Sequence, residues 1–222
     1  MESEKIDIIF LIDRSGSMYG SENDTIGGFN SFIAKQKKNE TNARVTTILF
    51  DHGYEVLYKR KNLYDVDDLT TNEYYVRGST ALLDAIGRTI TSMDREVENK
   101  VLFVITTDGY ENSSKEFSRQ QIKNMINSHN WEFIYLGADI DSYAEASSIG
   151  IRKSSVSNYK KSKEGIDTMY DCLSDATILY SKNENLDESW KKSLKSNQNV
   201  AKIPLPLPRQ GMNCTFGHII FF

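Results

Sequence analysis

Cysteine and long apolar runs are scarce in this chain of 222 residues, and each scarcity excludes a class of protein. The two cysteines, Cys172 and Cys214, are too few for a disulfide framework or a cysteine-based zinc site. Cys172 falls in an apolar helical pattern and is expected to be a buried thiol. No apolar run approaches the roughly 20 residues that a membrane-spanning helix needs. Because the N-terminus also lacks a signal-peptide layout, we expect a cytoplasmic protein without a membrane span.

The chain also lacks a strong charge of either sign. Its 27 Lys and Arg residues face 31 Asp and Glu residues, which gives a formal net charge of −4. Phosphate binding needs clustered positive charge, so nucleic-acid binding is not expected as the main function. With 39% hydrophobic and 26% charged residues, the composition is typical of a globular protein with one sizeable domain and room for a tail.

Short apolar runs alternate with helical patterns along most of the chain. Strands are expected near residues 8–12, 43–51, 54–60, 100–107, 131–138 and 152–157. Helices are expected near residues 24–38, 81–93, 117–128, 141–149 and 163–180, with a short helical turn at 65–70. This alternation predicts an α/β fold, a Rossmann-like three-layer α/β/α sandwich around a mostly parallel sheet. The turn signal His52-Gly53 joins two strands as a hairpin, so one antiparallel edge strand is expected.

The first helical pattern, at residues 24–38, contains an adjacent pair of glycines. Gly27 and Gly28 each weaken a helix by about 1 kcal/mol relative to alanine, so a close contact is expected to require them. Packing against the first strand is one candidate for that contact. Asp24 or Thr25 is the expected N-cap of this helix.

The sequence changes character towards its C-terminal end. We expect one domain over residues 1–181 and a tail of uncertain structure over residues 182–222. The first part of the tail is polar apart from Leu186, Trp190 and Leu194, whose spacing permits a turn or two of amphipathic helix docking on the domain. The remainder favours an extended segment and ends in an apolar peptide, with its three prolines at Pro204, Pro206 and Pro208 and the peptide at 218–222.

Three small oxygen-bearing side chains follow the first apolar run. Asp13, Ser15 and Ser17 come directly after the strand expected at residues 8–12. In open α/β sheets, ligands bind outside the carboxyl ends of the strands, and hard oxygen ligands there suit a hard divalent cation. Taken alone, the pattern also fits an ordinary loop in which Asp13 and Ser15 cap nearby backbone groups.

Two further residues bring oxygen ligands to the same edge of the predicted sheet. Thr80 stands at the start of a helix, and Asp108 follows directly after the strand expected at residues 100–107. If the first and fourth strands are neighbours, Asp13 and Asp108 lie side by side, and their charges repel unless a cation sits between them. Three hydroxyls and two carboxylates, together with water, can fill the octahedral shell that Mg²⁺ prefers.

Three stretches of the sequence resemble those of von Willebrand factor type A domains. They are Asp-Arg-Ser-Gly-Ser-Met at 13–18, Gly-Ser-Thr-Ala-Leu-Leu-Asp-Ala-Ile-Gly at 78–87, and Thr-Asp-Gly at 107–109. The resemblance covers roughly residues 5–180, in the right order and on the right elements. All five positions of that family's metal-ion-dependent adhesion site are present. The chain most resembles the small stand-alone bacterial and phage members.

The resemblance implies a role for each of these five residues. Ser15, Ser17 and Thr80 would ligate Mg²⁺ through their hydroxyl oxygens, with Mn²⁺ or Ca²⁺ as alternative ions. Asp13 and Asp108 would act largely through bound water. The remaining coordination position would take an acidic side chain from a partner protein. The resemblance therefore implies a binding module and not an enzyme.

Two other functions stay open. An aspartate at the end of a first strand also begins phosphoaspartate-forming phosphatases, which need a second acid two residues later, where this chain has Ser15. The sequence holds no Walker-type loop, no dinucleotide fingerprint and no nucleophile elbow. The third reading is a scaffold subunit whose metal is purely structural. The sequence indicates neither the partner nor the oligomeric state.

Several neighbouring residues are expected to have other roles. Asp84 should brace the Thr80 loop, and His52 should be a hairpin-turn residue, because a lone histidine is a poor metal site. Asp139 and Asp141 are expected to form a strand-end turn and a helix cap. Aromatic residues are enriched at interfaces, and four tyrosines are candidates for a contact rim around the site, although some of them are expected to belong to the core: Tyr19, Tyr74, Tyr75 and Tyr110.

Overall fold

Strand β1 (Ile6–Asp13) lies in the middle of the sheet, and its side chains alternate between two apolar cores. In the computed structural model, which describes residues 5–184 and 186–194, every residue of β1 is buried. Ile8 and Phe10 face one core, whereas Ile9 and Leu11 face the other. A strand covered on both faces needs apolar side chains on both, which explains the continuous apolar run.

The central sheet has six strands in the order β3-β2-β1-β4-β5-β6. The other strands are β2 (Ala43–Phe50), β3 (Tyr54–Asn62), β4 (Lys100–Thr107), β5 (Glu132–Ala138) and β6 (Val156–Tyr159). All neighbours pair in parallel except β2 and β3, which form an antiparallel hairpin at one edge. The predicted α/β sandwich with one antiparallel edge strand is therefore confirmed.

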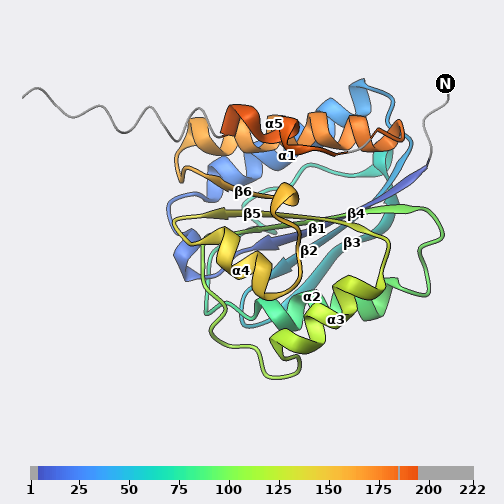
Figure 1. Cartoon of the computed structure of the whole chain (residues 1–222). Coiled ribbons are helices and arrows are strands. Elements are labelled where there is room, and N and C mark those ends of the chain that lie inside the picture. The colour runs from blue at the N-terminus through green and yellow to red at the C-terminus, as the bar shows by residue number, and fades with distance from the viewer. Residues whose placement is uncertain (1–4, 185, 195–222) are drawn as a thin grey trace, which may run out of the picture.

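Helices cover both faces of this sheet, as Figure 1 shows. Helices α1 (Glu22–Lys38) and α5 (Lys163–Ser181) lie side by side on one face and pack on the core that contains Phe10. Cys172 of α5 is buried there, as predicted. The other face carries α2 (Leu82–Met93), α3 (Arg119–Ser128) and α4 (Ser142–Ser148). The carboxyl ends of the parallel strands therefore meet at one edge between the helical layers.

Helix α1 begins earlier than its sequence pattern indicates. Its N-cap is Ser21, so the predicted cap at Asp24 or Thr25 is wrong. The Thr25 N–H already donates to the Ser21 carbonyl at 2.9 Å, as in a regular helical turn. The Glu22 carboxylate accepts the Gly20 N–H at 2.7 Å, which fixes the chain just before that turn.

Two short elements are also displaced from their predicted positions. The helical turn expected at 65–70 is a 3₁₀ turn at Leu63–Asp65, because the Asn62 side chain accepts the Tyr64 N–H and caps it there. Beyond it, the Asn30 amide donates to the Leu69 carbonyl and accepts its N–H, which ties down a non-helical segment. The strand expected at 152–157 begins only at Val156, because Lys153–Ser155 forms another 3₁₀ turn.

The glycine pair of α1 packs against the last helix and not against the first strand. A Cβ atom on Gly28 would lie 2.2 Å from Cδ2 of Tyr170 in α5, so only glycine lets the two helices approach this closely. Gly27 has open space around the same position. The expected contact with the first strand is therefore wrong for both residues, and Gly27 has no packing role among the described residues.

The chain continues to pack on the domain beyond the end of α5. Trp190 and Leu194 are buried in the core on the α1 and α5 side, and Leu186 packs against it, as their spacing predicts. The Trp190 Nε1 donates to the Ser154 carbonyl at 3.2 Å. The predicted proline segment and the apolar peptide at 218–222 lie outside the described residues. Within the described part of the chain, the helices are too short or too polar to cross a membrane.

Candidate metal centre

The loop after β1 is held in place by the segment that precedes Thr80. The Arg77 N–H donates to the Arg14 carbonyl at 2.8 Å, and the Gly16 N–H donates to the Gly78 carbonyl at 3.0 Å. Gly78 has φ of 69°, and a Cβ atom there would lie 2.0 Å from Nδ1 of His52. Glycine is therefore required at this position both by backbone conformation and by space. These contacts set Thr80 beside the end of β1.

The hydroxyls of Ser15, Ser17 and Thr80 come together in one cluster. Oγ of Ser15 lies 3.1 Å from Oγ of Ser17 and accepts the Thr80 hydroxyl at 2.9 Å. Gly109 closes this cluster from the third loop. A Cβ atom on Gly109 would lie 2.8 Å from Oγ1 of Thr80 and 3.0 Å from Oγ of Ser17. The missing side chain of Gly109 thus leaves a small space that the hydroxyls share.

Asp13 is fully buried, and both of its carboxylate oxygens accept hydrogen bonds. Oδ1 accepts the Ser15 N–H, and Oδ2 accepts the Thr107 hydroxyl, each at 2.6 Å. Burial raises the pKa of Asp13 to about 6, although these hydrogen bonds lower it and the nearby Asp108 raises it further. Thr107 was not singled out from the sequence. Strand pairing could have identified it, because Ile12 pairs with Thr106 and the next residues in both strands are therefore neighbours.

Asp108 is also buried, but its two carboxylate oxygens differ. Oδ2 lies 2.8 Å from Nζ of Lys161, and the same ammonium donates to the Ser17 carbonyl. Oδ1 is buried and has no hydrogen-bond partner within the described part of the chain. Lys161 belongs to the segment between β6 and α5, and sequence reasoning missed it. Its only sequence signal is a lysine-rich stretch, which is typical of a solvated loop.

All five predicted ligand residues therefore line or support one site. Its cavity has a volume of about 330 Å³ and is lined by Ser15, Ser17, Thr80 and Asp108, with Asp13 directly beneath Ser15. Over residues 5–184 and 186–194, no three His, Cys, Asp or Glu side chains gather as a metal cluster. A cation here would depend on hydroxyl oxygens, which suits a hard ion. The shared space at Gly109 and the unpaired Oδ1 of Asp108 both fit such an ion.

The acidic and histidine residues near the site have other roles. Asp84 accepts the N–H groups of Lys115, Glu116 and Phe117, at 2.8, 2.9 and 3.0 Å. It therefore braces the loop after β4, and the expected contact with the Thr80 loop is wrong. Asp141 caps α4 by accepting the Ala144 N–H, as predicted, and His52 lies in the β2–β3 turn. The predicted strand-end turn at Asp139 is observed, with φ of 55°.

Three of the four tyrosines predicted for the contact rim are exposed. Tyr19 is 79% exposed, Tyr110 is 51% exposed, and Tyr75 is 44% exposed. Tyr74 instead belongs to the core, as expected for some of the four. Its hydroxyl donates to the Asp13 carbonyl at 2.7 Å, and burial raises its pKa well above the ordinary value.

A charged cluster lies against the ring of Tyr75. The guanidinium groups of Arg14 and Arg77 lie 5.3 and 5.4 Å from the centre of its ring. Both guanidinium groups also donate to Oδ2 of the buried Asp51, at 2.9 and 2.8 Å. The exposed ring is therefore in contact with two cations that are themselves held by one carboxylate.

Comparison with known proteins identifies a family and a fold. The family model for the von Willebrand factor type A domain matches residues 7–171. Proximal thread matrix protein 1 from the mussel byssus is similar in structure, with TM-score 0.63, 15% identity, and coverage of 79% of this chain and 46% of that one. The pilus adhesin SpaC from Lactobacillus rhamnosus GG gives TM-score 0.65, 13% identity, and coverage of 81% and 31%. This chain therefore spans less than half the length of either structure.

A further similar structure is of comparable size. The vWF domain of the type V pili tip protein Mfa5 from Porphyromonas gingivalis gives TM-score 0.61 and 10% identity, and the match covers 80% of this chain and 97% of that one. At such identities the likeness of structures shows the fold alone. No curated protein matches the chain.

Proposed function

The chain belongs to the von Willebrand factor type A family, and from that premise we propose that it is a metal-dependent module that binds a partner protein. Members of this family are in general metal-dependent interaction or adhesion modules. The observation that carries the proposal is the shared space between the hydroxyls of Ser15, Ser17 and Thr80 beside the unpaired Oδ1 of Asp108. Neutral hydroxyls beside a buried carboxylate make an environment suited to a hard cation.

We propose Mg²⁺ as the ion, with Mn²⁺ and Ca²⁺ as alternatives. Ser15, Ser17 and Thr80 would bind it directly, and Asp13 and Asp108 would hold it largely through water. Asp13 suits an indirect role because both of its oxygens already accept hydrogen bonds from the protein. One mussel byssus structure is described as having a zinc-occupied MIDAS motif, which supports a divalent ion at this place in the fold.

We propose that the partner supplies a carboxylate to the metal. Neutral hydroxyl ligands leave most of the positive charge of the ion uncompensated, so it stays attractive to an incoming anion. The exposed rings of Tyr19, Tyr75 and Tyr110 stand on loops next to the ligand residues. Aromatic side chains are enriched in protein interfaces, and these three would contact the residues that flank the partner's acid.

A binding role is favoured over phosphatase chemistry by the surroundings of Asp13. A nucleophilic aspartate must present a free oxygen to the phosphorus atom. Here the Ser15 N–H and the Thr107 hydroxyl occupy the two oxygens, and the residue in the general-acid position is Ser15. The module is therefore proposed to act without catalysis.

We also infer a cytoplasmic location and kinship with small stand-alone bacterial or phage members. The low cysteine content agrees with a reducing compartment, and so with the cytoplasmic location. The similar structures include pilus proteins, such as the PilB minor pilin from Streptococcus sanguinis, so the competing location is the cell surface. Fractionation of the source cells, followed by detection of the protein in cytosol and envelope, separates the two.

Metal binding is tested by titrating Mg²⁺ into the purified protein while its melting temperature is recorded. An ion that binds only the folded state stabilises it by about 2.7 kcal/mol at a hundred times its dissociation constant, so the melting temperature should rise by several degrees. Ser15→Ala and Asp108→Ala should lose most of this rise. Ser79→Ala is the matched control, because Ser79 lines the cavity but is not a proposed ligand. Equal rises in all four proteins would show that the site is assigned to the wrong residues.

A further inference from the structure

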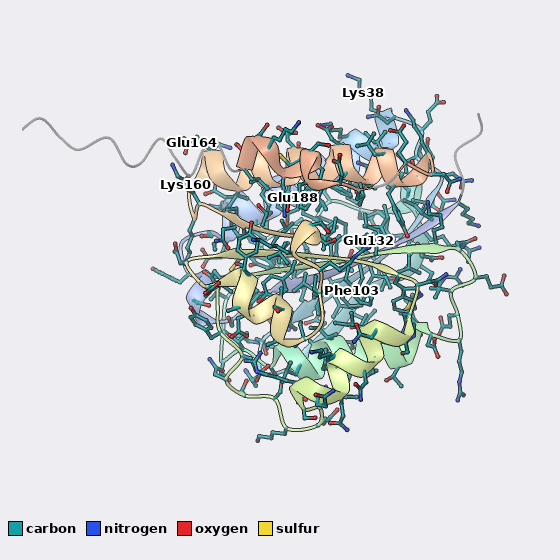
Figure 2. All side chains as sticks on the ribbon, viewed as in Figure 1. Lys38, Phe103, Glu132, Lys160, Glu164 and Glu188 are labelled. Carbon is teal, nitrogen blue, oxygen red and sulfur yellow. The ribbon has the colours of Figure 1, made fainter. Side chains whose placement is uncertain are left out.

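Lys161 places a positive charge against two residues of the proposed metal site. Its Nζ lies 2.8 Å from Oδ2 of Asp108 and donates to the Ser17 carbonyl. The Asp108 side chain is only 2% exposed and that of Lys161 only 25%. The ammonium therefore touches one proposed ligand residue by its carboxylate and a second by its backbone. Figure 2 labels Lys160 and Glu164, which flank this position where β6 gives way to α5.

A buried carboxylate needs a compensating charge, and Lys161 is the group that supplies it to Asp108. Removing one partner of such a pair leaves an uncompensated buried charge, which is strongly unfavourable. No other Lys or Arg side chain forms an ion pair with Asp108 in the described part of the chain. The second oxygen, Oδ1, lacks a hydrogen-bond partner within the same residues, so the carboxylate is only half satisfied by the ammonium.

Resting on the proposed metal site, we propose that Lys161 is a built-in competitor of the metal, which must leave Asp108 before a divalent ion can bind. The ammonium would serve as the counter-ion of the metal-free protein, and the metal would replace it. The dissociation constant for the metal would then depend on the stability of the Lys161–Asp108 ion pair as well as on the affinity of the ligand residues for the metal.

Competition follows from the position of the ammonium. The Lys161 ammonium contacts the Asp108 carboxylate and the Ser17 carbonyl. A divalent ion bound by Ser15, Ser17 and Thr80, with Asp108 beside it, would therefore lie next to Nζ of Lys161. Two cations that share one carboxylate repel each other, and the repulsion is stronger here because the Asp108 side chain is buried. The two states are therefore alternatives.

The side chain of Lys161 can leave without a large change in the backbone. The next residue, Ser162, is the N-cap of α5, and its hydroxyl accepts the Gly165 N–H at 3.2 Å. A Cβ atom on Gly165 would lie 2.2 Å from the Lys160 carbonyl oxygen, so the backbone is tightly packed on both sides of Lys161. A lysine side chain has a flexible four-carbon stem, and its rotation alone can carry the ammonium out to solvent.

The first experiment measures the Mg²⁺ dissociation constant by calorimetry for the wild type, Lys161→Met and Lys163→Met. Methionine keeps most of the length of the stem and removes the charge. Lys163→Met is the matched control, because Lys163 is two residues away, is 68% exposed and pairs with Asp167. Lys161→Met should bind Mg²⁺ about tenfold more tightly, which corresponds to a pair that is formed roughly nine-tenths of the time without metal. Lys163→Met should bind like the wild type.

The second experiment follows Lys161 in the unmodified protein, so it does not depend on the folding of a variant. Lysine acetylation by a succinimidyl ester is measured at each site by mass spectrometry, in EDTA and in saturating Mg²⁺. Acetylation of Lys161 should be slow in EDTA and several-fold faster with Mg²⁺. Acetylation of Lys163 should be the same in both.

The outcomes separate this inference from the proposed function. Tighter Mg²⁺ binding by Lys161→Met together with metal-dependent acetylation of Lys161 supports the competition. The competition is overturned, and the metal site stays intact, if the wild type binds Mg²⁺ but Lys161→Met binds it with the same or a weaker affinity. The same holds if the wild type binds Mg²⁺ but the acetylation of Lys161 does not change with Mg²⁺. Absence of Mg²⁺ binding in both the wild type and Lys161→Met overturns the metal site, and the competition with it.

Discussion

The Thr107 hydroxyl donates a 2.6 Å hydrogen bond to Oδ2 of Asp13 and thereby joins the ends of β1 and β4 beneath the candidate site. The same hydroxyl accepts the Gly109 N–H at 3.1 Å. The Thr107 side chain thus orients both Asp13, which is proposed to hold the ion through water, and Gly109, which leaves space for the ion. Thr107 is not a ligand in this arrangement, but the site depends on it.

Thr107→Val is therefore expected to destabilise the metal-free protein by about 1–3 kcal/mol, because it leaves an oxygen of the buried Asp13 carboxylate unsatisfied. Urea unfolding in EDTA measures the change. Thr106→Val is the matched control on the same strand, since the Thr106 hydroxyl is buried without a hydrogen-bond partner among residues 5–184 and 186–194. That control should be neutral or stabilising. Equal losses in both variants would argue against a special role for Thr107.

Asp84 supports the site from a distance, and its titration should be visible in the stability of the fold. Burial raises the pKa of Asp84, but the N–H groups of Lys115, Phe117 and Glu116 outweigh it and hold the pKa below its usual value. A lowered pKa in the folded state contributes stability above the unfolded pKa of about 4. This contribution is lost as the pH falls through the lower, folded pKa.

Asp84→Asn should accordingly unfold more easily at neutral pH, by about 1–3 kcal/mol, because an amide cannot accept the same set of N–H groups. The difference between the two proteins should shrink below pH of about 4, where the wild-type carboxylate also becomes protonated. Denaturant midpoints measured from pH 3 to pH 7 on both proteins would test this. If the difference in denaturant midpoint between the two proteins stays constant across that range, the charge of Asp84 is not the source of the stabilisation.

The two carboxylates of the site could be placed from sequence because each one follows a buried strand. The apolar runs that end at Asp13 and Asp108 leave little choice of structure, and parallel strands bring their carboxyl ends to one edge. Thr80 was placed by the strong pattern of the helix that follows it. These inferences needed only the order of elements, and the sheet order confirms that β1 and β4 are neighbours.

Residues outside regular elements could not be placed in the same way. Tyr74 lies in an irregular segment without periodicity, so no pattern distinguishes its buried ring from the exposed ring of Tyr75. Lys161 comes from a loop more than fifty residues after Asp108 in sequence, and only the three-dimensional packing brings the two charges together. Gly28 was singled out correctly as a contact, but its partner, Tyr170, lies on a helix that the sequence could not orient.

The segment after α5 offers a test of the division proposed at residue 181. Trp190 is 6% exposed and packs in the core on the α1 and α5 side, so Trp190→Ala should cost about 3 kcal/mol. Leu186→Ala is the control and should cost less, because Leu186 is only partly buried.

Removal of residues 183–222 should leave a domain that still unfolds cooperatively, at a lower denaturant concentration. Non-cooperative unfolding of that truncated chain would make the segment an integral part of the domain.

Gly109 allows the candidate site to be blocked without removal of any ligand. Its Cα faces the hydroxyls of Thr80 and Ser17, and an added Cβ would enter the space between them at 2.8 and 3.0 Å. Gly109→Ala should therefore weaken Mg²⁺ binding at least about tenfold, a loss of about 1.4 kcal/mol in binding free energy. In EDTA its stability should stay close to that of the wild type, because the methyl group meets movable hydroxyls and not backbone. Calorimetric titration and urea unfolding measure the two quantities on the same protein.

Gly27→Ala is the control for that substitution, since a Cβ atom there meets nothing within 4 Å. Alanine is favoured over glycine inside a helix, so this variant should gain about 0.5–1 kcal/mol of stability and bind Mg²⁺ unchanged. The two variants distinguish an effect on Mg²⁺ binding from an effect on stability. The methyl group at position 109 fills the site, whereas the methyl group at position 27 only stiffens α1. Undiminished Mg²⁺ binding by Gly109→Ala would mean that the ion does not occupy the space between the three hydroxyls, and another arrangement of ligands would then be required.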